Sequence, residues 1–213
     1  MASLGRDIIK GIAITGGVIL LFFLVIGLLF FGMIGGFQKT YTPSEMVESF
    51  DDHKQEINEL ISYFSTMAPK DKVIEIEFND DEELNRFGFT PPCDNSQKWF
   101  LDWDVQVESS LMDSLMDCLG WDLNQVRVLK KKLDAADCIQ IGRNLEGTHI
   151  GFKRSGMQMY SYVVYHQPVS DSLRTVIESH HMHLFANDTL AVEWAGGASG
   201  LQTWPDQMWD DLK

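Results

Sequence analysis

The sequence lacks the cysteine patterns of metal-binding and redox proteins. Its three cysteines, Cys93, Cys118 and Cys138, are widely spaced, and no two of them form a C-x-x-C pair. This spacing argues against a zinc ribbon and against a thioredoxin-type site. Cys118 falls on an apolar helical stripe and Cys138 opens an apolar strand, so both are expected to be buried small hydrophobes. Cys93 follows two prolines in an expected loop, and an oxidising compartment would permit one disulfide and leave one thiol.

Positive charge is also scarce. The chain has 17 Lys and Arg residues against 31 Asp and Glu residues, which gives a net charge of −14. Such a charge repels nucleic acid and anionic lipid head groups and favours basic partners. No nucleic-acid role is therefore expected.

Several catalytic and ion-binding motifs are missing. The sequence contains no H-E-x-x-H, no EF-hand pattern and no phosphate-binding loop with its Lys-Ser/Thr pair. Ser199 lies in a glycine-rich segment, but Leu201 occupies the position where a nucleophile elbow needs its second glycine. No catalytic residue is therefore assigned.

The N-terminal part contains one long apolar block. Residues 11–37 are 27 residues without a charge, rich in Ile, Leu, Val, Phe and Gly. A helix rises about 1.5 Å per residue, so this block is long enough to cross a hydrocarbon core of about 30 Å. It is about twice as long as the core of a cleavable signal peptide, and no small-x-small pattern ends it. We therefore expect a transmembrane anchor at residues 11–37.

The flanking charges predict the orientation of this anchor. Arg6 and Lys10 precede it, whereas Lys39 is followed by acidic residues. Because Lys and Arg collect on cytoplasmic flanks, we expect residues 1–10 in the cytoplasm. Residues 38–213 would then form a periplasmic or extracellular domain.

The anchor also contains pairs of small residues. Ala13 with Gly17 and Gly32 with Gly36 are small-x-x-x-small pairs, which let membrane helices approach closely. They are candidates for a homodimer contact through the anchor. The alternative interpretation is that glycine is simply common in membrane helices.

Apolar residues at helical spacing predict about three helices in the domain. The first covers residues 43–67, where Thr42 and Glu45 form a capping-box pattern and Pro69 ends the run. Two more are expected at residues 111–119 and 122–136, and a helical crossover at residues 170–179.

Alternating apolar and polar residues predict short strands. Residues 80–92, by contrast, are acidic and then contain Gly and Pro, which is typical of a loop or a short helix. The close spacing of the strands implies hairpins, so the fold class is α+β, with a mostly antiparallel sheet of about five to seven strands covered by about three helices. Strands are expected at residues 73–78, 99–107, 138–143, 148–154, 157–166, 180–185 and 189–194.

The histidine-rich segment at residues 180–183 is a candidate metal site. Residues two apart on a strand share a face, so His181 and His183 would present their imidazoles side by side to Zn²⁺ or another divalent metal. A third ligand could come from His166, His149 or a carboxylate. The simpler interpretation is that these histidines occupy the solvated face of an ordinary strand.

Acidic side chains on two expected strands form a second candidate site. Glu75 and Glu77 would meet Asp102 and Asp104 if their strands were neighbours. Like charges so close would need Ca²⁺ or a basic partner between them. The alternative is a solvated face that nearby Arg and Lys side chains balance.

Two tryptophans give the C-terminal segment an aromatic character. Exposed tryptophans often anchor protein interfaces, so Trp204 and Trp209 are candidate partner-binding residues. Alternatively, the tail packs across the sheet and completes the core.

The sequence as a whole favours a non-enzymatic binding domain held at a membrane surface. Its acidity suits the capture of a basic protein or peptide. An immunity-type protein or an accessory subunit of an envelope complex would act in this way. The alternative is a metal-dependent hydrolase with its metal at His181 and His183.

Overall fold

The computed structural model describes most of the chain. The described residues are 16–30, 39–93, 99–144, 147–155, 158–180, 182–195, 204, 208 and 211–212. Nine residues discussed above lie outside them: Arg6, Lys10, Ala13, Gly32, Gly36, His181, Ser199, Leu201 and Trp209.

The chain divides into two compact units. Residues 16–30 form a helix in the first unit, and its large apolar side chains are exposed. None of the described helices is both long and apolar enough to cross a membrane. Tyr41–Arg154 and Gln158–Lys213 form the second unit.

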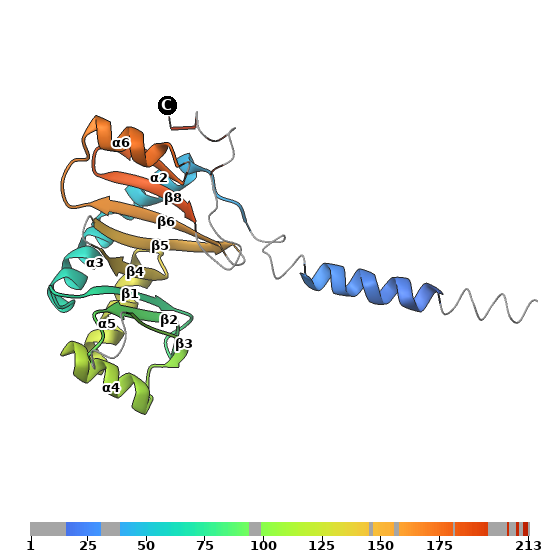
Figure 1. Ribbon diagram of the computed structural model, residues 1–213, viewed down its shortest axis with the longest axis horizontal. Coiled ribbons are helices and arrows are strands. Elements are labelled where there is room, and N and C mark those ends of the chain that lie inside the picture. Colours follow the sequence, from blue (N-terminus) through green and yellow to red (C-terminus); the bar gives the residue numbers. More distant parts are fainter. Residues whose placement is uncertain are drawn as a thin grey trace, which may run out of the picture. The chain divides into compact units, whose positions relative to one another are not determined.

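The second unit is an α+β domain built on one eight-stranded sheet. The strand order is β3-β2-β1-β4-β5-β6-β8-β7 (Figure 1). Every pair whose register is described is antiparallel, which confirms the expected fold class. The strands are β1 (Val73–Phe78), β2 (Glu83–Thr90), β3 (Phe100–Gln106), β4 (Gln140–Arg143), β5 (Gly147–Ser155), β6 (Gln158–Tyr165), β7 (His183–Asn187) and β8 (Leu190–Ala195).

The sheet is wider than expected because residues 80–92 contain a strand. The prediction of a loop or short helix there was wrong: β2 pairs with both β1 and β3. Its apolar residues Leu84, Phe87 and Phe89 are buried in the core. Gly88 interrupts the apolar pattern, but a Cβ at this position would lie 2.9 Å from the ring of Trp99. The glycine therefore serves the close packing of β2 and β3.

The first expected helix is present as two helices. They are α2 (Pro43–Asp52) and α3 (Lys54–Met67), and the chain leaves helical geometry at His53 with φ −109° and ψ 21°. The capping box of Thr42 and Glu45 is confirmed, since each side chain bonds to the other residue's backbone N–H.

The remaining expected helices are confirmed. They are α4 (Ser110–Leu119), α5 (Leu123–Ala135) and α6 (Asp171–Glu178). Gly120 ends α4 in the left-handed conformation, with φ 68°, which a glycine adopts without strain. Asp122 caps α5.

The main core lies between one face of the sheet and helices α2 to α5. Ile74, Ile76 and Ile141 from the central strands belong to it, together with apolar residues of all four helices. A smaller cluster lies on the other face, where Val163, Phe185 and Ala191 pack with Ile177 of α6. Helix α6 thus covers the second face at its β7 end.

Candidate binding site on the open face of the sheet

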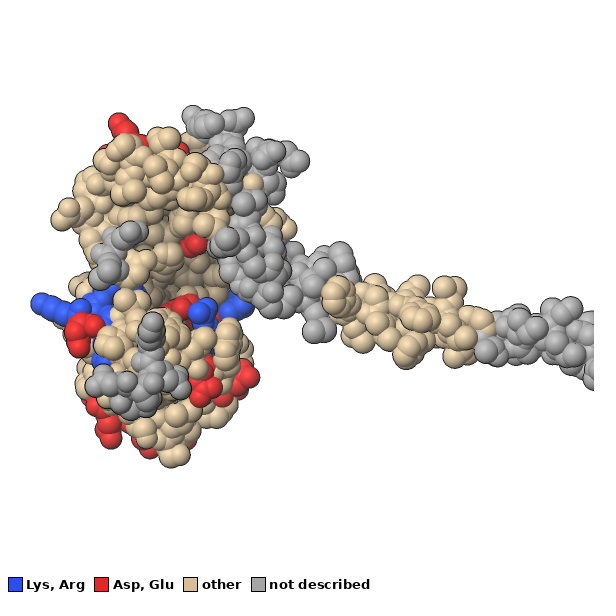
Figure 2. Space-filling view, viewed as in Figure 1, with Lys and Arg blue, Asp and Glu red and all other residues tan. Residues whose placement is uncertain are grey.

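The face of the sheet opposite α2 to α5 has charged side chains near its centre. The register aligns Gly88, Glu75, Gly142 and His149 in one row across β2, β1, β4 and β5. Residues directly opposite one another share a face, so this row lies on the side away from Ile74 and the main core. Figure 2 shows a hollow across the middle of the sheet, where basic and acidic side chains lie next to one another. We name this surface the open face.

Glu77 is the most deeply buried carboxylate on this face. Its side chain is only 2% exposed, and Arg154 pairs with both of its oxygens. Asn85 donates a third hydrogen bond to it, at 2.8 Å. The hydrogen bond to Glu77 raises the pKa of Arg154 above its usual value. With its acceptor sites taken in this way, Glu77 is suited to holding the sheet together rather than to binding a ligand.

Glu75 lies two residues away in a different environment. Its Oε1 accepts a hydrogen bond from Gln140 Nε2 at 2.6 Å and lies 3.0 Å from Arg86 Nη1. Burial nevertheless raises the pKa of Glu75, and the nearby charge of Glu77 adds to this effect. The positive partners Arg86 and His149 oppose it without cancelling it. A carboxyl group with a raised pKa in a recess is typical of functional sites.

Glu193 on β8 holds two histidines from different strands. Its Oε2 lies 3.3 Å from His149 Nδ1, and its Oε1 lies 3.7 Å from His183 Nε2. Strand β6 separates β5 from β8, and the residue opposite Glu193 on β6 is the small Ser161. Burial raises the pKa of Glu193, but the hydrogen bond and charge of His149 and the charge of His183 bring it below its usual value.

A recess of about 200 Å³ opens beside Glu75. Gly142 contributes no side chain to it, and a Cβ there would lie 3.0 Å from the carbonyl oxygen of Ile74. We name this recess the Glu75 pocket. It is lined by Val73, Ile74, Glu75, Trp99, Gln140, Gly142, Arg143, Asn144 and His149.

The β3 edge of the open face is aromatic and exposed. Trp103 is directly opposite Arg86, whose guanidinium lies 5.4 Å from the centre of the indole ring. The side chain of Trp103 is 51% exposed, and Leu101 beside it is 38% exposed. Exposed tryptophan paired with arginine is the composition that protein interfaces favour.

The expected convergence of four acidic residues was wrong. Strand β2 lies between β1 and β3, so Glu75 and Glu77 are not on a strand adjacent to Asp102 and Asp104. Asp102 is opposite Phe87, a core residue, and therefore lies on the other face of the sheet. Asp104 has a positive φ of 54° and falls between the paired positions of β3.

The expected histidine pair is only partly described. His181 lies outside the described residues, and His183 faces Glu193. The other two suggested ligands differ in position: His149 reaches the same carboxylate, whereas His166 is exposed beyond the end of β6. In the described part of the chain, no three or more His, Cys, Asp or Glu side chains are arranged to hold a metal ion.

The C-terminal tryptophan that the structure describes belongs to the core. Trp204 is 1% exposed, and its ring lies 6.0 Å from that of Tyr160 and 5.8 Å from that of Trp194. Trp204 is therefore not the exposed residue that the sequence suggested, and the tail packs across the sheet at this point, as the alternative interpretation expected. Trp209 lies outside the described residues.

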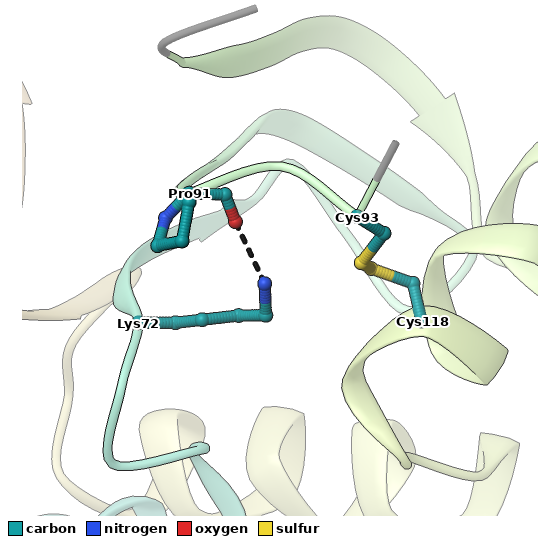
Figure 3. The surroundings of a disulfide bond; sticks show 4 residues. All are labelled: Lys72, Pro91, Cys93 and Cys118. Carbon is teal, nitrogen blue, oxygen red and sulfur yellow. Dashed lines mark hydrogen bonds between the residues drawn. A yellow bond between two sulfur atoms is a disulfide. The ribbon is translucent and has the colours of Figure 1, made fainter. Parts of the chain in front are cut away.

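Two of the three cysteines form a disulfide. Cys93, after β2, is bonded to Cys118 of α4, with their Cα atoms 5.9 Å apart (Figure 3). Cys118 was expected to be a buried small hydrophobe, but it is only half-buried and bonded to Cys93. Cys138 is buried, as expected, and free. Near the disulfide, Lys72 Nζ donates a hydrogen bond of 2.7 Å to the carbonyl of Pro91 (Figure 3).

Sequence reasoning missed several members of the site, among them Trp99, Trp103, Gly142 and Glu193. A glycine inside a strand is a recognised sign of a close approach or a recess, so Gly142 carried a usable signal. Glu193 also carried a signal, since it is a polar residue within an otherwise apolar strand. Only the strand order, however, brings these residues together.

No family model matches the chain, and no curated protein and no solved structure matches it.

Proposed function

We propose that this protein is a membrane-tethered binding protein that recognises a protein partner through the open face of its sheet. One observation carries the proposal: this face has the Glu75 pocket at its centre and exposed Trp103 at its edge. A solvated sheet face with no binding role needs neither a recessed carboxyl with a raised pKa nor a half-exposed indole.

The membrane tether in this proposal is the uncharged block at residues 11–37. The helix at residues 16–30 lies inside it and exposes large apolar side chains such as Leu20 and Phe23, at 70% and 65%. Lipid is the environment in which such exposure is favourable.

The domain in this proposal lies outside the cytoplasm. Two independent observations support this side of the membrane. Arg6 and Lys10 precede the apolar block, as positive residues do on cytoplasmic flanks. Cys93 and Cys118 form a disulfide, and disulfides form and persist mainly in oxidising compartments outside the cytoplasm.

The partner in this proposal is a basic protein. The net charge of −14 attracts positively charged molecules over a range set by the ionic strength. An immunity-type protein and an accessory subunit of an envelope complex are two forms that this role can take, and the identity of the captured protein distinguishes them.

The test compares two exposed apolar residues in the full-length protein. Trp103→Ser changes the open face, whereas Leu173→Ser changes α6, where Leu173 is 50% exposed. Each variant is purified from native membranes with its bound proteins. The proposal predicts that Trp103→Ser loses a stoichiometric partner that the wild type and Leu173→Ser both retain. Equal retention by both variants would contradict the open face as the recognition surface.

A further inference from the structure

The Glu75 pocket has the size of a single side chain. Its volume is about 200 Å³, which is below the range of about 300–1,000 Å³ typical of small-molecule sites. In the proposed function this pocket opens on the surface that binds a protein. Its occupant would then be one side chain of that partner.

The carboxylate of Glu75 is oriented for a further positive contact. Gln140 Nε2 and Arg86 Nη1 both approach Oε1. Within the described part of the chain no hydrogen bond or ion pair is made to Oε2, which is therefore the oxygen we assign to a ligand. The raised pKa means that burial makes the ionised form of Glu75 energetically less favourable than it is in water. A cation that enters the pocket would offset this cost.

Trp99 forms an aromatic wall of the same pocket. Its ring lies over Gly88, where a Cβ would come within 2.9 Å of Cζ2. An indole attracts a cation near its face and packs well against an alkyl chain. A pocket with a carboxylate beside an indole therefore suits a side chain that has a positive group at the end of an alkyl chain, such as lysine or arginine.

Among the described residues that line the Glu75 pocket, Arg143 is the one strongly basic side chain, and it is directed elsewhere. Arg143 Nη2 donates hydrogen bonds to the carbonyl groups of Ala68, Pro69 and Lys72, with distances of 3.4 Å to Ala68 and 3.3 Å to Lys72. Its guanidinium is thus engaged by backbone acceptors at the end of α3. This arrangement favours a cationic ligand over an anionic one.

We infer that the Glu75 pocket receives one lysine or arginine side chain of the protein partner. The ammonium or guanidinium group binds the carboxylate of Glu75, and the alkyl stem lies against Trp99. This inference rests on the proposed function and adds to it the chemical class of the residue that is recognised.

The test uses fluorine NMR of the full-length protein in detergent, labelled with fluorotryptophan. The chain has six tryptophans, and the resonance of Trp99 is assigned with Trp99→Phe. The probes are the acetylated amides of lysine, arginine, norleucine and glutamate. We expect the lysine and arginine probes to shift the Trp99 resonance saturably, and the norleucine and glutamate probes to leave it unchanged.

Two carboxylate variants provide the matched comparison. Glu75→Gln removes the charge in the pocket, and Glu48→Gln removes a charge from an exposed position on α2. Loss of a charged hydrogen bond weakens binding about tenfold or more, and we expect this only for Glu75→Gln. The other five tryptophan resonances report whether each variant is folded. If Glu75→Gln perturbs them, Glu75→Asp takes its place. It withdraws the carboxylate by one methylene, and we expect it to bind the cationic probes more weakly than Glu48→Gln does.

Three results would overturn the inference. They are equal affinity in Glu75→Gln and Glu48→Gln, an equal response to the norleucine probe, and a response to the glutamate probe alone. If the cationic probes fail while Trp103→Ser still loses the partner, the open face remains the recognition surface and only the class of bound side chain is wrong. If Trp103→Ser retains the partner, the proposed function itself fails.

Discussion

Glu75 and Gly142 lie directly opposite each other on β1 and β4, and this pairing creates the recess at the centre of the open face. A side chain at position 142 would stand beside the carboxylate and cover it. The glycine therefore keeps Glu75 accessible, although burial raises the pKa of Glu75. A position that sacrifices packing to leave a charged group accessible is characteristic of function rather than of stability.

Filling this recess should abolish binding without unfolding the domain. In Gly142→Ala, the new Cβ would lie 3.0 Å from the Ile74 carbonyl oxygen and 3.4 Å from the Glu75 Cα. Such tight packing costs about 1–3 kcal/mol, so we expect a folded protein whose Trp99 resonance no longer responds to the lysine probe. Gly27→Ala is the control, because a Cβ there meets no other atom within 4 Å. Undiminished probe binding in Gly142→Ala would contradict the assigned position of the ligand.

Removing Arg154 and removing Glu77 should destabilise the domain to different extents, although the two residues form one ion pair. Arg154→Met leaves the 2%-exposed Glu77 without its cation, whereas Glu77→Gln leaves an arginine that is 28% exposed and can reach water. Removing one partner of a buried pair costs about 3–5 kcal/mol. We expect a loss of this size for Arg154→Met and a smaller one for Glu77→Gln, as measured by urea unfolding. Equal losses would contradict the description of Glu77 as the buried member.

The stability of the domain should fall at acidic pH in part through Glu193. The pKa of Glu193 is below its usual value in the folded protein, so the unfolded chain takes up a proton first as the pH falls. The stabilisation is therefore present above the ordinary pKa of a glutamate, about 4.3, and is lost as the pH drops through the lower folded value.

The measurement is the free energy of unfolding between about pH 3 and pH 7 for the wild type and for Glu193→Gln. The variant should show a weaker decline below about pH 4.5, because it has no carboxyl group to titrate at this position. Glu75 acts in the opposite direction, since its pKa is raised. A steeper decline in Glu193→Gln than in the wild type would contradict this role for Glu193.

The cysteines should differ sharply in reactivity. Burial raises the pKa of the Cys138 thiol to about 12, and Cys93 and Cys118 are joined. Native protein should therefore bind no thiol reagent, unfolded protein should bind one equivalent, and unfolded reduced protein should bind three, the full number of cysteines. Two or more reactive thiols in unfolded, unreduced protein would contradict the disulfide.

Local patterns in the sequence predicted most elements of the domain but not their arrangement. Val73–Phe78 alternates cleanly, and Gly120 and Asp122 mark helix ends, because these signals depend on neighbouring residues alone. Strand β2 escaped detection because Gly88 interrupts its apolar pattern. The glycine makes room for the ring of Trp99, just before β3, and such a contact has no local signature. The first helix was predicted as one continuous helix, whereas the structure divides it at His53.

The candidate site was less accessible from the sequence for the same reason. Glu75 stood out because it alternates with apolar residues along its own strand. Its relation to Trp99, Gly142 and His149 depends on which strands are neighbours, and that order does not follow the order of the chain. The predicted meeting with Asp102 and Asp104 was wrong because β2 inserts between the two strands.

Photo-crosslinking in native membranes tests the central claim most directly, namely that the open face is the surface that meets the partner. The full-length protein carries benzoylphenylalanine at position 103 on the open face or at position 48 on α2, both exposed. The account predicts one discrete crosslinked protein from position 103 that is absent from position 48, with a yield that falls as salt screens the acidic domain. The same product from both positions, or a discrete product from position 48 alone, would contradict it.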